Sequence, residues 1–268
     1  MQRRGGLVVG LLLALALGTA AAAPLADAGP RATRPLDGRV VLGTGRGYVL
    51  HVPARAGAAA GRPALLVLHG LTSNPRDVAV TTGFDRLADR DGVLVAYPEG
   101  FRNSFNAGLC CGAAAELAVD DLGYLTDVVA DLRRRGAGRV AVVGFSNGGM
   151  MAYRFACERP DLVDSVGVYA GTLEIPVCRG RIRALHLHGA EDVTVPFAGA
   201  AYSGLLHAFL RDVRTIPGAA PGSDIRILLL PHQAHRWTVR GDVLDASAAF
   251  WSFAGLGAAP GMGSATPG

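Results

Sequence analysis

The chain has 268 residues and a formal net charge of +4, and all 26 of its Lys and Arg residues are arginine. The absence of lysine excludes serine–lysine dyads, Schiff-base chemistry and a Walker phosphate loop, because each needs a lysine amine. The small net charge gives no indication of a nucleic-acid partner. A nucleophilic serine in this chain would have to be activated by histidine.

The N-terminus has the layout of a secretory signal peptide. Arg3 and Arg4 precede an apolar stretch from Leu7 to Leu17, and alanine-rich cleavage sites follow. The apolar stretch is shorter than the roughly 20 residues of a membrane span. We therefore expect a secreted protein without a membrane partner. The chain is predicted to divide into a signal peptide (1–28), a flexible leader (29–38), one catalytic domain (39–256) and a disordered tail (257–268).

Short apolar runs alternate with segments of helical periodicity through the predicted domain. A glycine-rich turn from Gly43 to Gly47 joins the first two runs, which predicts a hairpin. Strands that alternate with helices predict a mostly parallel sheet. The strands are predicted at 40–42, 48–52, 64–68, 93–97, 140–143, 166–169, 184–187 and 225–230, and the helices at 83–89, 122–134, 149–158 and 198–213.

Four cysteines in an exported chain favour two disulfide bonds over free thiols. They are Cys110, Cys111, Cys157 and Cys178. A bridge between the adjacent Cys110 and Cys111 would be strained, so we expect each of them to pair with one of the other two. Their spacing does not resemble a zinc site.

Residues 144–148 read Gly-Phe-Ser-Asn-Gly and directly follow the predicted strand at 140–143. A G-x-S-x-G sequence in this position is typical of a nucleophile elbow, a sharp strand-to-helix turn that exposes Ser146 and needs small neighbours. An incidental serine in a glycine-rich turn is the alternative. The position of the elbow favours the α/β-hydrolase fold, with helices on both faces of the sheet. Only ten residues, Leu173 to Ile182, lie where lipases insert a cap, so no cap domain is expected.

In this fold the partners follow Ser146 in the order acid, then histidine. Asp192 lies in the turn after the strand at 184–187. Glu191 is its rival, but the shorter aspartate is better suited to a fixed turn that orients an imidazole. We predict Asp192 as the acid.

Three histidines follow Asp192 along the chain. His207 falls within a predicted helix, whereas His232 and His235 follow the last predicted strand, where the general base is expected. His232 directly follows Pro231 and is explained as the start of the turn. We predict His235 as the base.

An oxyanion hole needs two backbone N–H groups aimed at the developing negative charge. The residue after the nucleophile, Asn147, supplies one of them. The second is expected after the strand at 64–68, where Gly70 permits close approach of the backbone and Leu71 or Thr72 supplies the donor.

His186 and His188 alternate on a predicted strand, which could suit a metal pair. No further cluster of histidines or carboxylates completes a ligand set. We favour buried, hydrogen-bonded histidines and predict no metal and no cofactor.

Several motifs point to one family when they are taken together. They lie at 69–72, 97–100, 106–112, 144–152, 188–196 and 235–237. In combination they resemble the polyhydroxybutyrate depolymerase-like esterases, which are close to the feruloyl and acetylxylan esterases of carbohydrate esterase family 1. The resemblance covers about 39–256 and implies that Ser146, Asp192 and His235 form the triad. Ala234 departs from the glycine that often precedes the histidine in this family. We expect His69 and Trp237 to contact the substrate.

The predicted function is hydrolysis of carboxylic esters through an acyl-enzyme, without a protein partner. A shallow cleft is expected, together with soluble hydroxyalkanoate oligomers or side-chain esters as substrates. The alternatives are a feruloyl or acetylxylan esterase acting on polysaccharide, a secreted serine peptidase, and a non-catalytic binding protein on a hydrolase fold.

Overall fold

The protein is described by a computed structural model that covers residues 38–53, 60–178, 180–197 and 222–257. All of these belong to one unit that begins at Leu36. The predicted signal peptide, nearly all of the leader, the helix expected over 198–213 and almost the whole tail lie outside the described residues.

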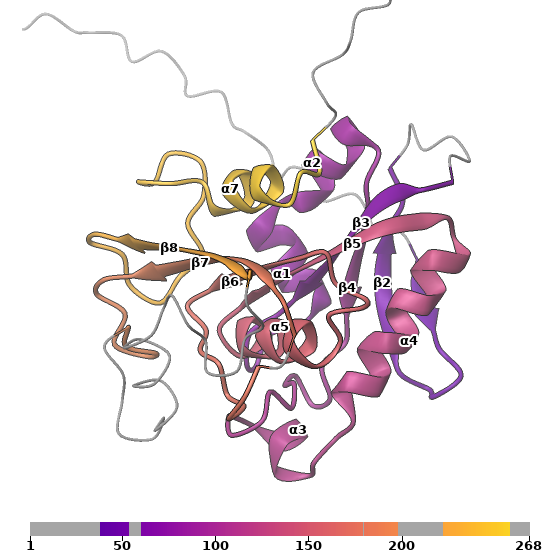
Figure 1. Cartoon of the computed structure of the whole chain (residues 1–268), viewed down its shortest axis with the longest axis horizontal. Helices are drawn as coiled ribbons and strands as arrows, with labels where there is room; N and C mark the ends of the chain where they lie inside the picture. Colours follow the sequence, from indigo (N-terminus) through magenta and orange to yellow (C-terminus); the bar gives the residue numbers. More distant parts are fainter. Residues whose placement is uncertain (1–37, 54–59, 179, 198–221, 258–268) are drawn as a thin grey trace, which may run out of the picture. The chain divides into compact units, whose positions relative to one another are not determined.

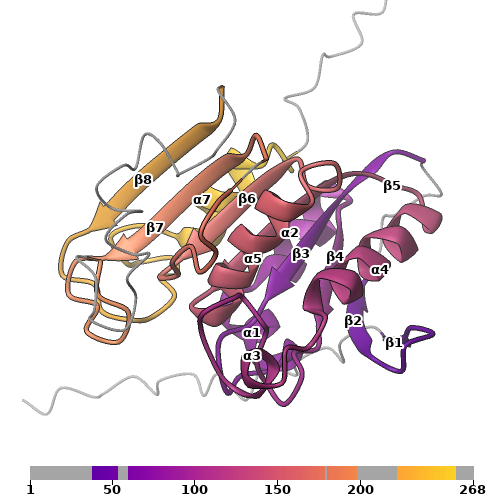
Figure 2. The same ribbon diagram turned by 60° about the horizontal axis from the view of Figure 1, so that its bottom comes forward.

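The described strands form one sheet with the order β1-β2-β4-β3-β5-β6-β7-β8 (Figure 2). β1 pairs antiparallel with β2, β2 pairs antiparallel with β4, and the remaining neighbours are parallel. The predicted hairpin and the mostly parallel sheet are thus confirmed. The strands are β1 (Arg39–Val41), β2 (Gly47–His51), β3 (Arg62–Leu68), β4 (Leu94–Pro98), β5 (Ala137–Phe145), β6 (Ser165–Tyr169), β7 (Arg183–Gly189) and β8 (Asp224–Leu230).

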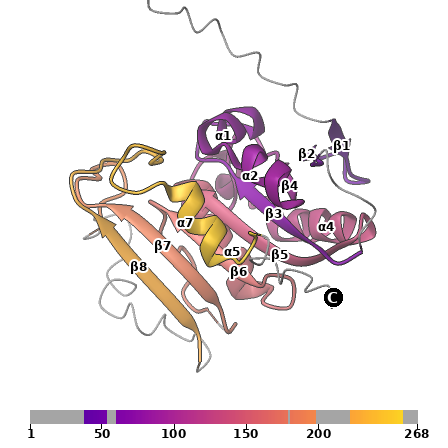
Figure 3. The same cartoon turned by 90° about the horizontal axis from the view of Figure 1, so that it is seen from above.

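Helices cover both faces of the sheet (Figures 1 and 3). Alternate residues of a strand point to opposite faces, so Leu66 and Leu68 of β3 pack in one core with α4 and α5, while Leu65 and Val67 pack in the other with α1, α2 and α7. The described helices are α1 (Pro75–Thr82), α2 (Phe84–Asp91), α3 (Ala113–Glu116), α4 (Asp121–Arg134), α5 (Asn147–Glu158) and α7 (Ala246–Phe253).

Local capping explains where the two short helices α1 and α2 begin and end. Asn74 accepts the N–H groups of Arg76 and Asp77, and Pro75 occupies the first turn of α1, where it needs no hydrogen bond. Gly83 ends α1 with φ 61°, a conformation that suits glycine. These caps allow two short helices to follow one another between β3 and β4.

The carboxyl ends of β3, β5, β7 and β8 meet at one edge of the sheet. Parallel strands place the loops that follow them along the same edge, where ligands bind in open α/β sheets. This edge therefore collects the loops that contain Leu71, Ser146, Asp192 and His235.

The disulfide pairing differs from the prediction. The two bonds join Cys157 to Cys178 and Cys110 to its neighbour Cys111. The peptide bond between Cys110 and Cys111 is cis, and their Cα atoms lie 3.2 Å apart. Cys157 and Cys178 lie across α5 and the loop after β6 with Cα atoms 4.8 Å apart, an ordinary separation for a bridge. The prediction was wrong because it ruled out a bond between adjacent residues.

No helix among the described residues combines the length and the apolar character that crossing a membrane requires.

Candidate active site

The nucleophile elbow lies at the end of β5, in the middle of the sheet. Ser146 has φ 53° and ψ −124°, a positive-φ conformation that non-glycine residues rarely adopt, and its N–H donates to the carbonyl oxygen of Tyr169 at 2.9 Å. A Cβ atom on Gly144 would lie 2.1 Å from the carbonyl oxygen of Gly148, and one on Gly148 would lie 2.3 Å from that of Leu68. The turn therefore requires glycine at both positions, because backbone packs directly on backbone there.

Asp192 and His235 come from the loops after β7 and β8 and are joined by a hydrogen bond. Nδ1 of His235 lies 2.6 Å from Oδ2 of Asp192. Because the carboxylate only accepts, Nδ1 carries the proton and Nε2 remains as an acceptor. His235 and Ser146 line the same pocket. The three side chains expected of a serine–histidine–aspartate triad are thus gathered at one site.

In the loop after β7, hydrogen bonds compensate the negative charge of Asp192. Oδ1 accepts the N–H groups of Thr194 at 2.9 Å and Val195 at 2.8 Å, and Asp192 is 4% exposed. Burial alone would raise the pKa of Asp192, but the hydrogen bonds from His235 and from the N–H of Val195 outweigh it and lower the pKa below its usual value. Asp192 is therefore ionised at neutral pH.

The rival acid and base pair with each other on the surface. Nδ1 of His232 lies 2.9 Å from Oε1 of Glu191, and their side chains are 87% and 61% exposed. Neither lines the pocket that contains Ser146. The geometry therefore favours Asp192 and His235 over this pair.

The backbone N–H groups of Asn147, at the start of α5, and of Leu71, in the pocket wall, have no hydrogen-bond partner among the described residues. Of the two donors that the sequence left open, Thr72 already donates its N–H to the carbonyl oxygen of Asn103 at 2.9 Å. Leu71 is the better candidate for the second oxyanion donor.

His69 supports the backbone of this region. Nε2 accepts the N–H of Gly100 at 3.0 Å, so Nδ1 carries the proton and donates to the carbonyl oxygen of Gly70 at 2.8 Å. Burial lowers the pKa of His69, whose side chain is 0% exposed. We expected His69 to contact substrate, but both of its ring nitrogens are occupied by backbone groups and it does not line the pocket. It joins the loop after β3 to the loop after β4.

Trp237, which we predicted to contact the substrate, forms part of the pocket wall. Its Nε1 donates to Oγ of Ser247 at 3.0 Å, and that hydroxyl donates in turn to the carbonyl oxygen of Thr82 at 2.6 Å. The indole is therefore held in place by α1 and α7.

The pocket has a volume of about 630 Å³, which is within the range of small-molecule sites. Sequence reasoning missed several of its residues. Glu174 follows β6, where an acidic residue after a buried strand was an available signal. The apolar residues among those missed give no signal, because an apolar side chain looks the same in the sequence whether it lines a pocket or packs in the core. The missed residues include Leu109, Cys110, Cys111, Met150, Glu174 and Val195.

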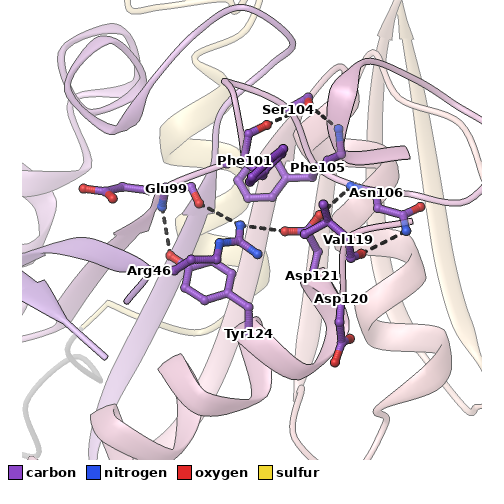
Figure 4. A network of polar contacts seen from close by, with 12 residues as sticks. Arg46, Glu99, Phe101, Ser104, Phe105, Asn106, Val119, Asp120, Asp121 and Tyr124 are labelled. Atoms are coloured by element: carbon purple, nitrogen blue, oxygen red, sulfur yellow. Dashed lines mark hydrogen bonds and ion pairs between the residues drawn. The ribbon is translucent and has the colours of Figure 1, made fainter. Parts of the chain in front are cut away.

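The connection between β4 and α4, which includes α3, contributes the disulfide to this wall and is anchored by a polar network (Figure 4). Arg46 forms a 2.7 Å ion pair with Asp121 and donates to the carbonyl oxygen of Glu99 at 2.8 Å. Asp121 also accepts the N–H of Asn106 at 2.6 Å. Although Arg46 favours the charged form of Asp121, burial dominates and raises the pKa of this carboxyl.

The side chain of Asn147 joins the same loop to the elbow. Its Oδ1 accepts the N–H of Phe105 at 2.8 Å, and its Nδ2 donates to the carbonyl oxygen of Phe105 at 2.9 Å. Nδ2 also lies 3.7 Å from the sulfur of Cys111. The side chain is thereby occupied, whereas the backbone N–H of Asn147 has no partner among the described residues.

His186 and His188 take part in a directed chain of hydrogen bonds. Nε2 of His188 donates to the carbonyl oxygen of Val195 at 2.7 Å, so Nδ1 accepts from Nε2 of His186 at 3.0 Å. Nδ1 of His186 then accepts the hydroxyl of Tyr153 at 2.9 Å. Burial lowers the pKa of both histidines, and the chain of bonds agrees with neutral rings. Its end at Val195 supports the loop that holds Asp192.

The strand order and the position of the elbow define an α/β-hydrolase fold. An acetyl xylan esterase from Aspergillus awamori has the same fold, with a TM-score of 0.62 and 16% identity over 82% of this chain and 98% of that one. The family model "Esterase", described as "Putative esterase", matches residues 41–253. The chain therefore belongs to this esterase family, as its motifs predicted.

Two curated relatives extend the comparison. "Putative esterase NocK" of Nocardia uniformis is 35% identical over 66% of this chain and 52% of its own length. "Probable feruloyl esterase C" of Aspergillus terreus is 30% identical over 58% of this chain and 58% of its own length. The chain thus matches little more than half the length of these relatives.

Proposed function

We propose that this chain is a secreted serine esterase that hydrolyses carboxylic esters through an acyl-enzyme on Ser146. The observation that carries the proposal is the 2.6 Å hydrogen bond between Asp192 and His235, which leaves Nε2 of His235 as a base in the pocket that Ser146 lines. The predicted signal peptide supports secretion, as do the two disulfides, because such bonds persist in oxidising compartments.

The residues divide the reaction into two steps. His235 accepts the Ser146 proton as the hydroxyl attacks the ester carbonyl, and Asp192 stabilises the imidazolium that forms. The N–H groups of Asn147 and Leu71 bind the oxyanion, and His235 then protonates the leaving alcohol. Water activated by His235 later hydrolyses the acyl-enzyme and restores Ser146.

The substrates proposed are hydroxyalkanoate oligomers, as the depolymerase-like motifs suggest. The feruloyl esterase relative and the acetyl xylan esterase with the same fold support polysaccharide-linked esters as the second candidate. Both candidates use the same chemistry at Ser146, and they differ in the group that must fit the pocket.

The test combines labelling with hydrolysis. The wild-type protein should react with a fluorophosphonate probe and hydrolyse p-nitrophenyl butyrate, and Ser146→Ala should lose labelling and about 10⁴-fold or more in kcat. Ser252→Ala, which changes an exposed serine on α7, is the matched control. Full activity in Ser146→Ala would overturn the proposal.

A second experiment separates the two substrate classes. Hydroxybutyrate oligomers, feruloyl sugars and acetylated xylan are assayed side by side, and a peptide substrate tests for peptidase activity.

A further inference from the structure

The pocket wall contains a buried carboxyl group that the proposed mechanism does not use. Glu174 lies in the connection between β6 and β7 and lines the same pocket as Ser146, yet it is only 3% exposed. Its neighbours in the wall include the apolar side chains of Leu109, Met150 and Val195. A polar group removed from water costs free energy unless a partner satisfies it, so its position calls for an explanation.

One half of the carboxyl group is satisfied within the protein. The hydroxyl of Thr172, which is 2% exposed, donates to Oε1 of Glu174. No described residue bonds to Oε2. Oε2 of Glu174 is not among the buried side-chain atoms that lack a hydrogen bond in the described part of the chain, so this oxygen is not fully enclosed. Because Glu174 lines the pocket, the pocket is the space in which Oε2 can meet a ligand.

The backbone around Glu174 is held closely against the loop that contains the Cys110–Cys111 disulfide. The carbonyl oxygen of Glu174 accepts the N–H of Leu109 at 3.1 Å. A Cβ atom on Gly108 would lie 2.2 Å from that same oxygen, so glycine is required for the contact. The backbone contact with Leu109 and the side-chain hydrogen bond from Thr172 together fix the position of the Glu174 carboxyl group.

We propose that Oε2 of Glu174 binds a hydroxyl group of the ester substrate that lies over Ser146. A hydroxyl both donates and accepts, so it matches a carboxyl oxygen whose partner Oε1 is already occupied by Thr172. The inference rests on the proposed esterase function and adds a specificity-determining residue to it.

An uncharged substrate group fits this site better than a cation. Burial raises the pKa of Glu174, an effect that the hydrogen bond from Thr172 opposes only in part, so the site disfavours charge on this carboxyl. A cation would also lose its own hydration at this buried site, whereas a hydroxyl needs only one directed hydrogen bond. The hydroxyl could belong to a 3-hydroxyacyl chain, to a phenolic acyl group or to a sugar.

The experiment measures kcat/KM for matched pairs of esters that differ at the hydroxyl. The pairs are p-nitrophenyl 3-hydroxybutyrate with p-nitrophenyl butyrate, methyl ferulate with methyl 3,4-dimethoxycinnamate, and a xyloside monoacetate with cyclohexyl acetate. The wild-type enzyme should prefer the hydroxylated member of one pair by about tenfold or more, since a site built to bind a hydroxyl disfavours the analogue that lacks it. The pair that shows the preference identifies the source of the hydroxyl.

Variants assign the preference to Glu174. Glu174→Met should lower the preference to about onefold, whereas Glu174→Gln, which replaces the carboxyl with an uncharged hydrogen-bonding group, should retain most of it. Thr172→Val, which leaves the carboxyl group unanchored, should lower it in part and serves if Glu174→Met does not fold. Glu116→Met, an exposed position on α3 outside the pocket, is the matched control.

Three outcomes would overturn the inference: no preference in any pair, a preference that persists in Glu174→Met, or a preference for butyrylcholine over 3,3-dimethylbutyl butyrate that Glu174→Gln abolishes. Failure of the proposed function is distinguishable from these, because the wild-type protein would then fail to hydrolyse p-nitrophenyl butyrate through Ser146.

Discussion

The two halves of the candidate active site are built by different means. The nucleophile arm, from β5 through Ser146 into α5, is fixed by backbone packed on backbone, with no room for a Cβ atom at Gly144 or Gly148. The acid–base arm, formed by residues 189–196 and 231–237, is fixed by side-chain hydrogen bonds that run from His188 to Val195 and from Asp192 to His235.

This difference predicts how a substitution in each arm affects the fold and the activity. Contacts between backbone atoms leave no alternative arrangement, so an added methyl group breaks the nucleophile arm as a whole. Hydrogen bonds between side chains can be removed one at a time, so the acid–base arm can lose function while the fold remains.

The largest effect is expected in the nucleophile arm. Gly144→Ala should abolish activity and lower the free energy of unfolding by about 3 kcal/mol or more, because the new Cβ would lie 2.1 Å from the carbonyl oxygen of Gly148. Thermal melting and p-nitrophenyl butyrate hydrolysis measure the two effects. Gly43→Ala is the control, because a Cβ at Gly43 meets nothing within 4 Å. Equal stability of the two variants would contradict the account of the elbow.

The acid–base arm should lose activity with a much smaller loss of stability. Asp192→Asn should lower kcat by about 10³- to 10⁴-fold, because the amide no longer holds the imidazole in the required tautomer. Glu191→Gln, which changes the exposed neighbour, should leave kcat nearly unchanged. If Glu191→Gln were the inactive variant, the assignment of the acid would be wrong.

The same variant has an expected pH dependence. The folded-state pKa of Asp192 is lowered, so its ionised form stabilises the fold above the unfolded pKa of about 3.9, and this contribution is lost as pH falls through the folded value. The stability difference between wild type and Asp192→Asn should therefore be constant at neutral pH and should shrink below about pH 4. Denaturant unfolding at pH 7 and in steps below pH 4 measures it.

The smallest effect is expected at His188, whose hydrogen bond to Val195 supports the loop that holds Asp192. His188→Leu should lower the free energy of unfolding by about 1–3 kcal/mol, because it leaves the buried carbonyl oxygen of Val195 without its donor. A drop of about tenfold in kcat should accompany it, since Val195 also holds Asp192. His188→Gln, whose amide can donate to the same oxygen, should recover part of both losses. Identical behaviour of the Leu and Gln variants would contradict this positioning role.

The sequence predicted what short-range patterns encode. All eight strands appear near their predicted places, because each is an apolar run bounded by turns. Three helices in the described part of the chain were missed for physical reasons. α1 contains β-branched Val78 and Val80 and depends on its Asn74 cap, and α7 is too uniformly apolar to show helical periodicity. The third, α3, has only four residues.

The candidate site divides in the same manner. The closely spaced glycines around Ser146 predict the elbow from the sequence, because a sharp turn in which backbone packs on backbone needs residues without a Cβ atom. The buried position of His69 and the contact of the Glu174 backbone with Leu109 depend on segments that lie far apart in the chain. A single sequence contains no signal for such contacts, so they could not be predicted.

The bond between Cys157 and Cys178 ties the connection after β6 to the helix that begins at the nucleophile. Cys178 lies four residues beyond Glu174, so residues 171–177 are closed at one end by the sheet and at the other by a covalent bond. Within this segment Leu173 and Ile175 pack in the core, and a Cβ atom on Gly171 would lie 3.0 Å from the carbonyl oxygen of Ser146. Redesign of substrate preference should therefore begin at Glu174 alone and leave its neighbours and the disulfide in place.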